Sequence, residues 1–242
     1  MPALSVVVAA GQKVQLVLAQ EEVKGENAIE AALRLIQGEG RVVTLDAGLN
    51  QREIADAIVK RGAYLGVVKD NHARLREILL QDLLAGKGVS LKQRNRRHGR
   101  VENREYWWVE ADQEMRMYLE RELGWPQVRW YGWVKRQRKR LRSGEWSEEE
   151  VVWIYGGEKE VTPRQLSQWA RGHWEIENCV FWVLDVTYQE DRSHARKIGG
   201  LLHAIRCMAI NVIRCQGFRY VPDGRRSASA RSDRGVAWLS AY

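Results

Sequence analysis

The order in which apolar patterns follow one another constrains the fold of this chain most. Two short stretches rich in β-forming residues, 4–9 and 14–19, are separated by only four residues, which is typical of a hairpin. Residues 27–37 then carry apolar side chains at helical spacing, and Gly38 ends that pattern. The short continuous apolar run within 41–48 is typical of a buried parallel strand.

The same alternation continues through the first third of the sequence. Asn50 stands three residues before Glu53, and this capping-box pattern predicts that Asn50 caps a helix. Residues 63–69 favour another strand, and residues 72–86 favour an amphipathic helix that ends at glycine. The resulting order, ββαβαβα, predicts an α/β sheet.

The pattern changes after about residue 90. Strands are predicted at 100–110, 128–136 and 149–155, with a short helix at 112–123 between the first two. This part shows no alternation of strands and helices, so we expect a mostly antiparallel β insertion that interrupts the α/β core.

Helical patterns return after the insertion. Thr162, Pro163 and Gln165 have the spacing of an N-cap, a first helical position and a capping-box partner, so a long helix should begin here. A second helix is predicted at 196–216, and the arginine-rich tail should be loop-like or partly disordered. The expected regions are a first part of the core at 1–90, a basic β-rich insertion at 91–160, a helical part of the core at 161–216, and a tail at 217–242.

Composition excludes several classes of protein. The chain has 242 residues, and no apolar run approaches the ~20 residues that span a bilayer. Its three cysteines form no closely spaced pair and the five histidines do not pair with them, which argues against a disulfide framework and a zinc site. We therefore expect reduced thiols in a cytoplasmic protein that has no membrane segment.

The net charge of +8 is concentrated in two runs. Residues 92–104 contain six Lys or Arg and one Glu, and residues 129–142 contain seven Lys or Arg and no acid. Runs of one sign favour a polyanionic partner, whereas the alternative is a surface that serves only solubility. The chain also has eleven tryptophans. Four of them lie near the basic runs, namely Trp107, Trp108, Trp130 and Trp133. They could stack on nucleobases or form the core of the insertion, and we favour the core for most of the four.

Two carboxylates stand out as candidate metal ligands. Asp46 follows a predicted strand, and ligands bind at the carboxyl ends of strands in open α/β sheets, although such an Asp can also only bond turn amides. Glu177 borders the apolar stripe of the long helix, where it could bind a metal or pair with a basic side chain.

Three segments, taken together, resemble a known family. They are VVTLDAGLNQREIADAIVKRGAYLGVVKDN, HGRVENREYWWV and RGHWEIENCVFWVLDVTYQEDRSHAR. The chain resembles the DDE-type transposases of bacterial insertion sequences, specifically the H-repeat-associated group that carries a β insertion, from about residue 5 to about residue 215.

This resemblance implies an α/β fold with an RNase H-like core, a mixed sheet with flanking helices, in which acidic residues hold two Mg²⁺ (or Mn²⁺) ions. Asp46 matches the family's second acid and Glu177 its third. Two metals held by shared carboxylates activate the nucleophile and stabilise the leaving oxygen in phosphodiester chemistry. Lys69 matches a lysine at the edge of that site, where it could contact phosphate or simply face solvent.

The resemblance also implies partners: the transposon ends and target DNA, and a homodimer on DNA, with no membrane and no small-molecule cofactor. The expected location is the bacterial cytoplasm, associated with the nucleoid. Basic side chains would contact phosphates without reading sequence. The candidate DNA-binding residues are Lys69, Arg96, Arg97, His98, Arg100, Arg104, Lys135, Arg136, Arg138, Lys139 and Arg140.

One departure bears on activity. The family's first acid lies on the first strand of its sheet, but no Asp precedes Asp46 in this sequence. We therefore expect an N-terminally truncated transposase that binds metal weakly and does not cleave DNA as it stands. The alternatives are a catalytically dead DNA-binding remnant and a basic RNA-binding or nuclease-like protein.

Overall fold

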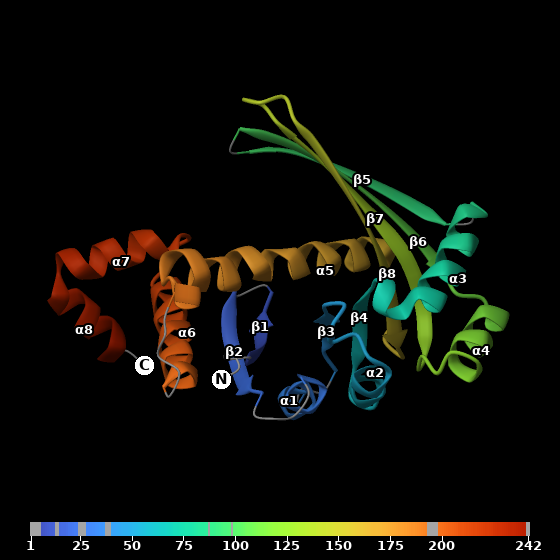
Figure 1. Cartoon of the computed structure of the whole chain (residues 1–242), viewed down its shortest axis with the longest axis horizontal. Coiled ribbons are helices and arrows are strands. Elements are labelled where there is room, and N and C mark those ends of the chain that lie inside the picture. Colours follow the sequence, from blue (N-terminus) through green and yellow to red (C-terminus); the bar gives the residue numbers. More distant parts are fainter. Residues whose placement is uncertain are drawn as a thin grey trace. The chain divides into compact units, whose positions relative to one another are not determined.

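The computed structural model describes residues 6–12, 15–23, 28–36, 40–86, 88–97, 99–192 and 198–240 (Figure 1). The chain divides into two compact units. One unit comprises Ile36–Ala170, and the other comprises Met1–Leu35 together with Arg171–Tyr242.

The unit formed by residues 36–170 is built on a six-stranded sheet with the order β3-β4-β8-β7-β6-β5. Only the β3–β4 pair is parallel, and every other neighbouring pair is antiparallel. Because β8 pairs with β4, the strands of the predicted insertion continue the sheet of the α/β part. The strands are β3 (Val42–Leu45), β4 (Ala63–Val68), β5 (Val89–Arg97), β6 (Arg100–Glu110), β7 (Val128–Arg140) and β8 (Trp146–Gly157).

Short amphipathic helices cover this sheet. Helix α2 (Arg52–Val59) buries Ile54 and Ile58, which are four residues apart and therefore share one face. Helix α3 (Ala73–Leu84) follows the short 3₁₀ turn η1 (Asp70–His72) and buries leucines at the same spacing. Helix α4 (Gln113–Arg121) is capped by the Asp112 carboxylate, which accepts a hydrogen bond from the Met115 amide over 2.8 Å.

Large aromatic side chains fill the space between sheet and helices. Trp108 is fully buried, and its indole N–H donates to the Ser167 hydroxyl over 2.9 Å, so its polar atom is satisfied. This burial confirms the predicted core role for Trp108. The other three candidate tryptophans of the insertion, Trp107, Trp130 and Trp133, are partly buried.

The structure corrects two details of the sequence analysis in this unit. Asn50 does not cap α2: the N-cap is Gln51, which makes no side-chain capping bond, and Asn50 is completely buried. In addition, β5 forms across the first basic run, for which the sequence pattern predicts no strand. That run lacks apolar alternation, and its strand forms because its backbone pairs with β6 along nine consecutive residue pairs.

The second unit contains the predicted hairpin as a separate two-stranded antiparallel sheet, β1 (Val6–Gly11) and β2 (Leu16–Glu22), followed by α1 (Ala28–Leu35). The edge of β2 is held by a side chain that imitates a neighbouring strand. The Asn211 amide accepts from the Val17 N–H over 2.9 Å and donates to the Val17 carbonyl over 2.7 Å.

The long helix α5 (Pro163–Ile176) begins as predicted. The Gln165 side chain accepts from the Thr162 amide over 2.9 Å, and the Thr162 hydroxyl accepts from the Gln165 amide over 3.3 Å, which together form a capping box. Beyond Ile176 the chain stays helical but widens into π-helical turns, η2 (Glu177–Phe181) and η3 (Val183–Thr187), before the 3₁₀ turn η4 (Glu190–Arg192).

Helix α6 (Gly199–Cys215) confirms the second predicted helix, but the prediction of a loop-like tail is wrong. Residues of the tail form α7 (Val221–Ala230) and α8 (Ser232–Ser240). Val221 is buried in a cluster with Val183, Ile210 and Ile213, so tertiary packing stabilises a segment whose periodicity is weak. Within the described residues, no helix is both long enough and apolar enough to cross a membrane.

Candidate functional site

Asp46 lies where the sequence predicts it, directly after β3 and exposed to solvent. Its carboxylate accepts a hydrogen bond from the Leu49 amide over 2.7 Å, and its main-chain carbonyl accepts from the Asn50 amide over 2.9 Å. These bonds fold residues 46–50 into a tight turn. Asp46 therefore stabilises its own turn, and its exposed carboxylate also faces solvent at the carboxyl end of the strand.

Asn50 fixes this turn to the next strand. Its side-chain amide donates to the Val67 carbonyl over 2.9 Å, although both groups are buried. Gly66 makes this approach possible, because a Cβ there would lie 2.1 Å from the Asn50 side-chain oxygen. The same oxygen is buried and has no hydrogen-bond partner among the described residues. The position of Asn50 therefore depends on the hydrogen bond from its side-chain NH₂ group to Val67 and on close packing.

The segment after β4 adds two more bonds to the turn. Asn71 donates to the Ala47 carbonyl over 2.7 Å, and the His72 Nε2 lies 2.7 Å from the Asn50 carbonyl, to which it donates. The ring of His72 packs edge-on against Trp125, with ring centres 5.0 Å apart. Because β3 and β4 are parallel neighbours, Asp46 and the exposed Lys69 follow strand ends at the same edge of the sheet.

Glu177 belongs to the other unit and is exposed at the first position of the π-helical turn η2. Single π-turns within α-helices are frequent at functional sites. The next residue, Asn178, donates its side-chain amide to the Trp174 carbonyl over 2.9 Å and supports the widened turn. The resemblance to transposases implies that Glu177 and Asp46 hold the same metal ions in one crevice, and this shared site stays a prediction.

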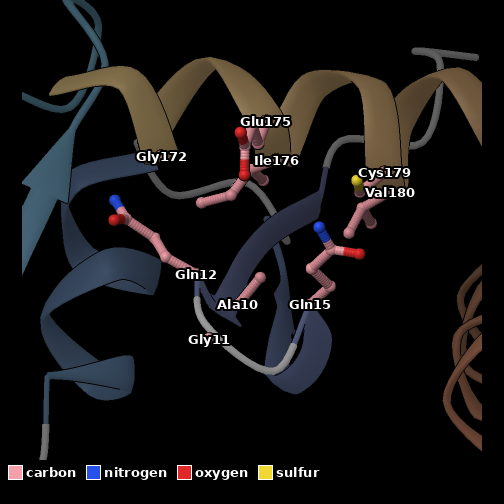
Figure 2. Close-up of a pocket in the computed structure, with 9 residues that line it drawn as sticks. All are labelled: Ala10, Gly11, Gln12, Gln15, Gly172, Glu175, Ile176, Cys179 and Val180. Carbon is pink, nitrogen blue, oxygen red and sulfur yellow. The ribbon is translucent and has the colours of Figure 1, made fainter. Parts of the chain in front are cut away.

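A small pocket lies between the hairpin turn and the helix that carries Glu177 (Figure 2). Gly172 faces the turn so closely that a Cβ would lie 2.3 Å from the Gln12 side-chain oxygen. On the other side, the Arg214 guanidinium donates to the carbonyls of Gln15 and Cys179, which joins α6, the hairpin and η2. The residues that line the pocket are Ala10, Gly11, Gln12, Gln15, Gly172, Glu175, Ile176, Cys179 and Val180.

These carboxylates do not complete a metal centre. In the part of the chain that the structure describes, there is no group of three or more His, Cys, Asp or Glu side chains that could hold a metal ion. Asp46 and Glu177 are exposed carboxylates of the chemical type that Mg²⁺ accepts.

The two basic runs lie on the neighbouring strands β5, β6 and β7. The outer halves of these strands and of β8 form what we call the ribbon (residues 92–104 and 135–150). These halves extend away from α2, α3 and α4 (Figure 1). Directly paired residues of neighbouring strands share one face of a sheet. By this register, Arg104 pairs with Arg136 and Glu102 pairs with Arg138, so all four lie on one face.

Glu102 organises the cations of that face. Its carboxylate contacts Arg104 at 3.0 Å and Arg138 at 3.4 Å, and it also accepts a short hydrogen bond from Arg136. Burial opposes ionisation of Glu102, but the bond from Arg136 and the charges of the three guanidinium groups outweigh it, so the pKa of Glu102 lies below its ordinary value. Burial, together with the charge of Arg136, lowers the pKa of Arg138.

The predicted DNA-binding residues therefore fall into distinct environments. Arg104 is buried and Arg136 nearly so, and both serve the Glu102 cluster. Lys135 is engaged by Glu148 at 2.6 Å and Glu150 at 3.2 Å. Arg140 forms a long ion pair with Glu145, and the Lys139 ammonium lies over the Trp146 ring. The exposed positions are Lys69, Arg96, Arg100 and Arg140. His98 and the side chain of Arg97 lie outside the described residues.

The sequence analysis missed Asn50 and His72 as residues that hold the Asp46 turn, and it missed Trp146 at the end of the ribbon. Gly66 in the middle of an apolar strand is an available signal, because glycine inside a strand often marks the close approach of another group. The run of acids after Trp146 matches the run of bases before it, which is the pattern of a charged hairpin.

Comparisons with known proteins agree with this fold. Residues 4–212 match the family model described as the transposase DDE domain. Curated relatives include YbfL of Escherichia coli (strain K12), 27% identical over 194 residues, and "Putative transposase YncI" of E. coli O157:H7, 28% identical over 197 residues. A third is "H repeat-associated putative transposase YhhI" of E. coli (strain K12), 27% identical over 194 residues.

Each of these matches covers 77% of this chain but only 49–50% of the relative. The chain thus spans about half the length of the curated relatives it matches. No solved structure matches it. The family model nevertheless covers most of the sequence, including Asp46, the ribbon and Glu177. The chain therefore belongs to the transposase DDE domain family.

Proposed function

We propose that this chain is part of an insertion-sequence transposase and that it binds DNA through the exposed cations of the ribbon. The observation that carries this proposal is the gathering of two basic runs, separate in sequence, on the three paired strands β5, β6 and β7. Guanidinium and ammonium groups that neutralise phosphates release condensed counterions, which drives binding that does not depend on base sequence. Transposon ends and target DNA are the duplexes that this role requires.

The cations of the ribbon differ in how well they can reach the phosphates of DNA. Arg104 and Arg136 are held by Glu102, so they contribute to DNA binding by adding positive charge to the surface of the ribbon. Arg100 and Arg140 pair with each other across β6 and β7 and are exposed. We expect these two arginines to make phosphate contacts, with Lys69 near the Asp46 turn as a further contact.

Asp46 and Glu177 are the carboxylates that we assign to the metal ligands of this transposase. When bound, a pair of Mg²⁺ or Mn²⁺ ions supplies nucleophile activation and leaving-group stabilisation for phosphodiester chemistry. Because no Asp precedes Asp46 in this sequence to match the family's first acid, we propose that the chain by itself binds DNA without cleaving it. Dimerisation on DNA and association with the nucleoid belong to the same proposal.

The test is DNA binding by fluorescence anisotropy, with a labelled duplex at several salt concentrations. Replacing Arg100 and Arg140 together by alanine should weaken binding and lower the slope of log K against log salt by roughly 2, since each phosphate contact contributes about 0.9. Neither change removes a partner of Glu102, so the ribbon should stay folded.

The matched control removes two positive charges elsewhere in the same unit. Lys60 and Arg61 are exposed after α2, and their joint replacement by alanine should leave the salt slope unchanged. Equal slopes for both double variants would reject the ribbon as the DNA-binding surface. Tighter binding to duplex RNA than to duplex DNA would instead favour the RNA-binding alternative.

A further inference from the structure

The outer end of the ribbon carries an exposed tryptophan among cations. By register, Arg96 pairs with Val101, Val101 with Lys139, and Lys139 with Trp146, so the four residues form one row across the ribbon on the same face. Trp146 is 56% exposed, and the Lys139 ammonium lies 5.3 Å from the centre of its ring.

This exposure is unusual for the chain. All eleven tryptophans lie in the described residues, and only Trp146 and Trp182 are exposed. An indole left in water forfeits the burial of a large apolar surface, so folding alone gives no reason to place it at the end of a ribbon. A ligand that covers the ring would regain that stabilisation.

The charges of this face are arranged so that the outer row is positive. The acids lie in the two inner rows: Glu148 is held by Lys135 and Gln137, and Glu150 by Lys135. In the outer row, by contrast, Arg96 is exposed and forms no ion pair within the described ranges, and Arg94, which is also exposed, lies in the neighbouring row with Glu148. The outer row therefore combines a flat aromatic ring with uncompensated cations.

We propose that Trp146 is a stacking platform for an unpaired nucleobase and that Arg94, Arg96 and Lys139 hold the phosphates beside it. Stacking on an aromatic ring beside a cationic groove is how proteins bind single-stranded nucleic acid without strong sequence preference. Strands β5 and β8 are three strand spacings apart, about 14 Å, so a strand of a few nucleotides would reach from Trp146 to Arg96. The inference rests on the proposed DNA-binding function and adds a preference for unpaired DNA.

The experiment compares the affinity of the full chain for labelled (dT)₁₂ and for a blunt duplex. Trp146→Ala should weaken binding of (dT)₁₂ about tenfold, within the range measured for loss of one stacking contact, and leave duplex binding unchanged. Trp146→Phe keeps an aromatic ring and should retain most of the affinity. Because Trp146 is exposed, thermal unfolding of both variants should match that of the wild type.

Tyr220 provides the matched control. It is 49% exposed, and the Arg219 guanidinium lies 5.4 Å from its ring centre, so it is also an exposed aromatic with a cation over it. Tyr220→Ala should leave both affinities unchanged. An equal loss for Tyr220→Ala, an equal loss on single strand and duplex for Trp146→Ala, or no loss at all would overturn the inference. Wild-type protein that binds neither DNA would reject the proposed function as well, whereas intact duplex binding would isolate the failure to Trp146.

Discussion

The side-chain amide of Asn50 donates a hydrogen bond to the Val67 carbonyl over 2.9 Å, and both groups are buried. This bond joins the turn that begins at Asp46 to the end of β4. His72 donates to the main-chain carbonyl of the same Asn50. The position of the Asp46 carboxylate is therefore set by β4 as well as by its own strand.

Gly66→Ala should loosen this arrangement. The new Cβ would lie 2.1 Å from the Asn50 side-chain oxygen, much closer than van der Waals contact allows. Because neither strand β4 nor Asn50 is free to move in the buried interior, we expect a loss of about 1–3 kcal/mol in the free energy of unfolding. Urea denaturation followed by tryptophan fluorescence measures this value.

A double-mutant cycle separates the steric conflict from a general effect of adding a methyl group. In an Asn50→Ala background the conflict is gone, so Gly66→Ala should cost about 1 kcal/mol less than in the wild type. Gly48→Ala serves as the control, because its Cβ would meet the Asp46 carboxylate at an ordinary 3.6 Å. Additive effects of Asn50→Ala and Gly66→Ala would contradict this coupling between the turn and β4.

Asn50 also shows where prediction from the sequence reaches its limit. The pattern Asn50–Glu53 satisfies the local rule for a helix cap, and the helix does follow. The side chain nevertheless turns inward, because a bond to the distant Val67 carbonyl competes with the local cap. Thr162 and Gln165 obey the same local rule and do form their capping box, since no tertiary partner draws them away.

Long-range pairing explains the other differences. β5 has no apolar alternation, yet its backbone is held by β6. Helices α7 and α8 have little periodicity, but Val221 is buried and Phe218 packs against Trp238 with ring centres 5.5 Å apart. Strands, helices and their order could be predicted from local patterns, whereas these segments depend on partners far along the chain.

The candidate site, like the fold, was predictable from local sequence patterns only in part. Asp46 and Lys69 follow apolar runs, so the topology of a parallel pair places both at one edge of the sheet. Glu177 emerged from the resemblance to transposases, because an exposed glutamate on a helix has no distinctive local signal. The availability of each ribbon cation depended on which acids face it across the strands, and that requires the register.

Glu102→Gln should destabilise the ribbon. The change removes the carboxylate that contacts Arg104, Arg136 and Arg138 together, and leaves three guanidinium groups close to one another. We expect a loss of roughly 2–3 kcal/mol in the free energy of unfolding, at or below the lower end for a broken buried ion pair, because Glu102 is only partly buried. Val101 and Asn103 flank Glu102 on the opposite face, so Asn103→Ala is the control and should change stability little.

Glu102→Gln should also remove the part of the pH dependence of the unfolding free energy that comes from the Glu102 carboxylate. The pKa of Glu102 is lower in the folded than in the unfolded chain, so its stabilisation is fully present above the ordinary glutamate pKa of about 4.3 and is lost as the pH falls through the lower, folded value. The difference in stability between wild type and Glu102→Gln should be constant at neutral pH and shrink below about pH 4. A constant difference down to about pH 2 would show that Glu102 is not held as an ion.

Our last prediction is that this chain binds DNA but does not nick it. Two-metal phosphodiester chemistry needs both ions in fixed positions, and ligands that act as a unit fail as a unit when one is missing. Supercoiled plasmid incubated with the purified chain and Mg²⁺ or Mn²⁺ should therefore remain supercoiled. Asp46→Asn and Glu177→Gln should behave like the wild type in this assay and retain its DNA affinity within about twofold, because neither carboxylate belongs to the ribbon. Metal-dependent nicking that is abolished by Asp46→Asn would contradict the prediction and would show that another acid of the chain completes the metal ligands.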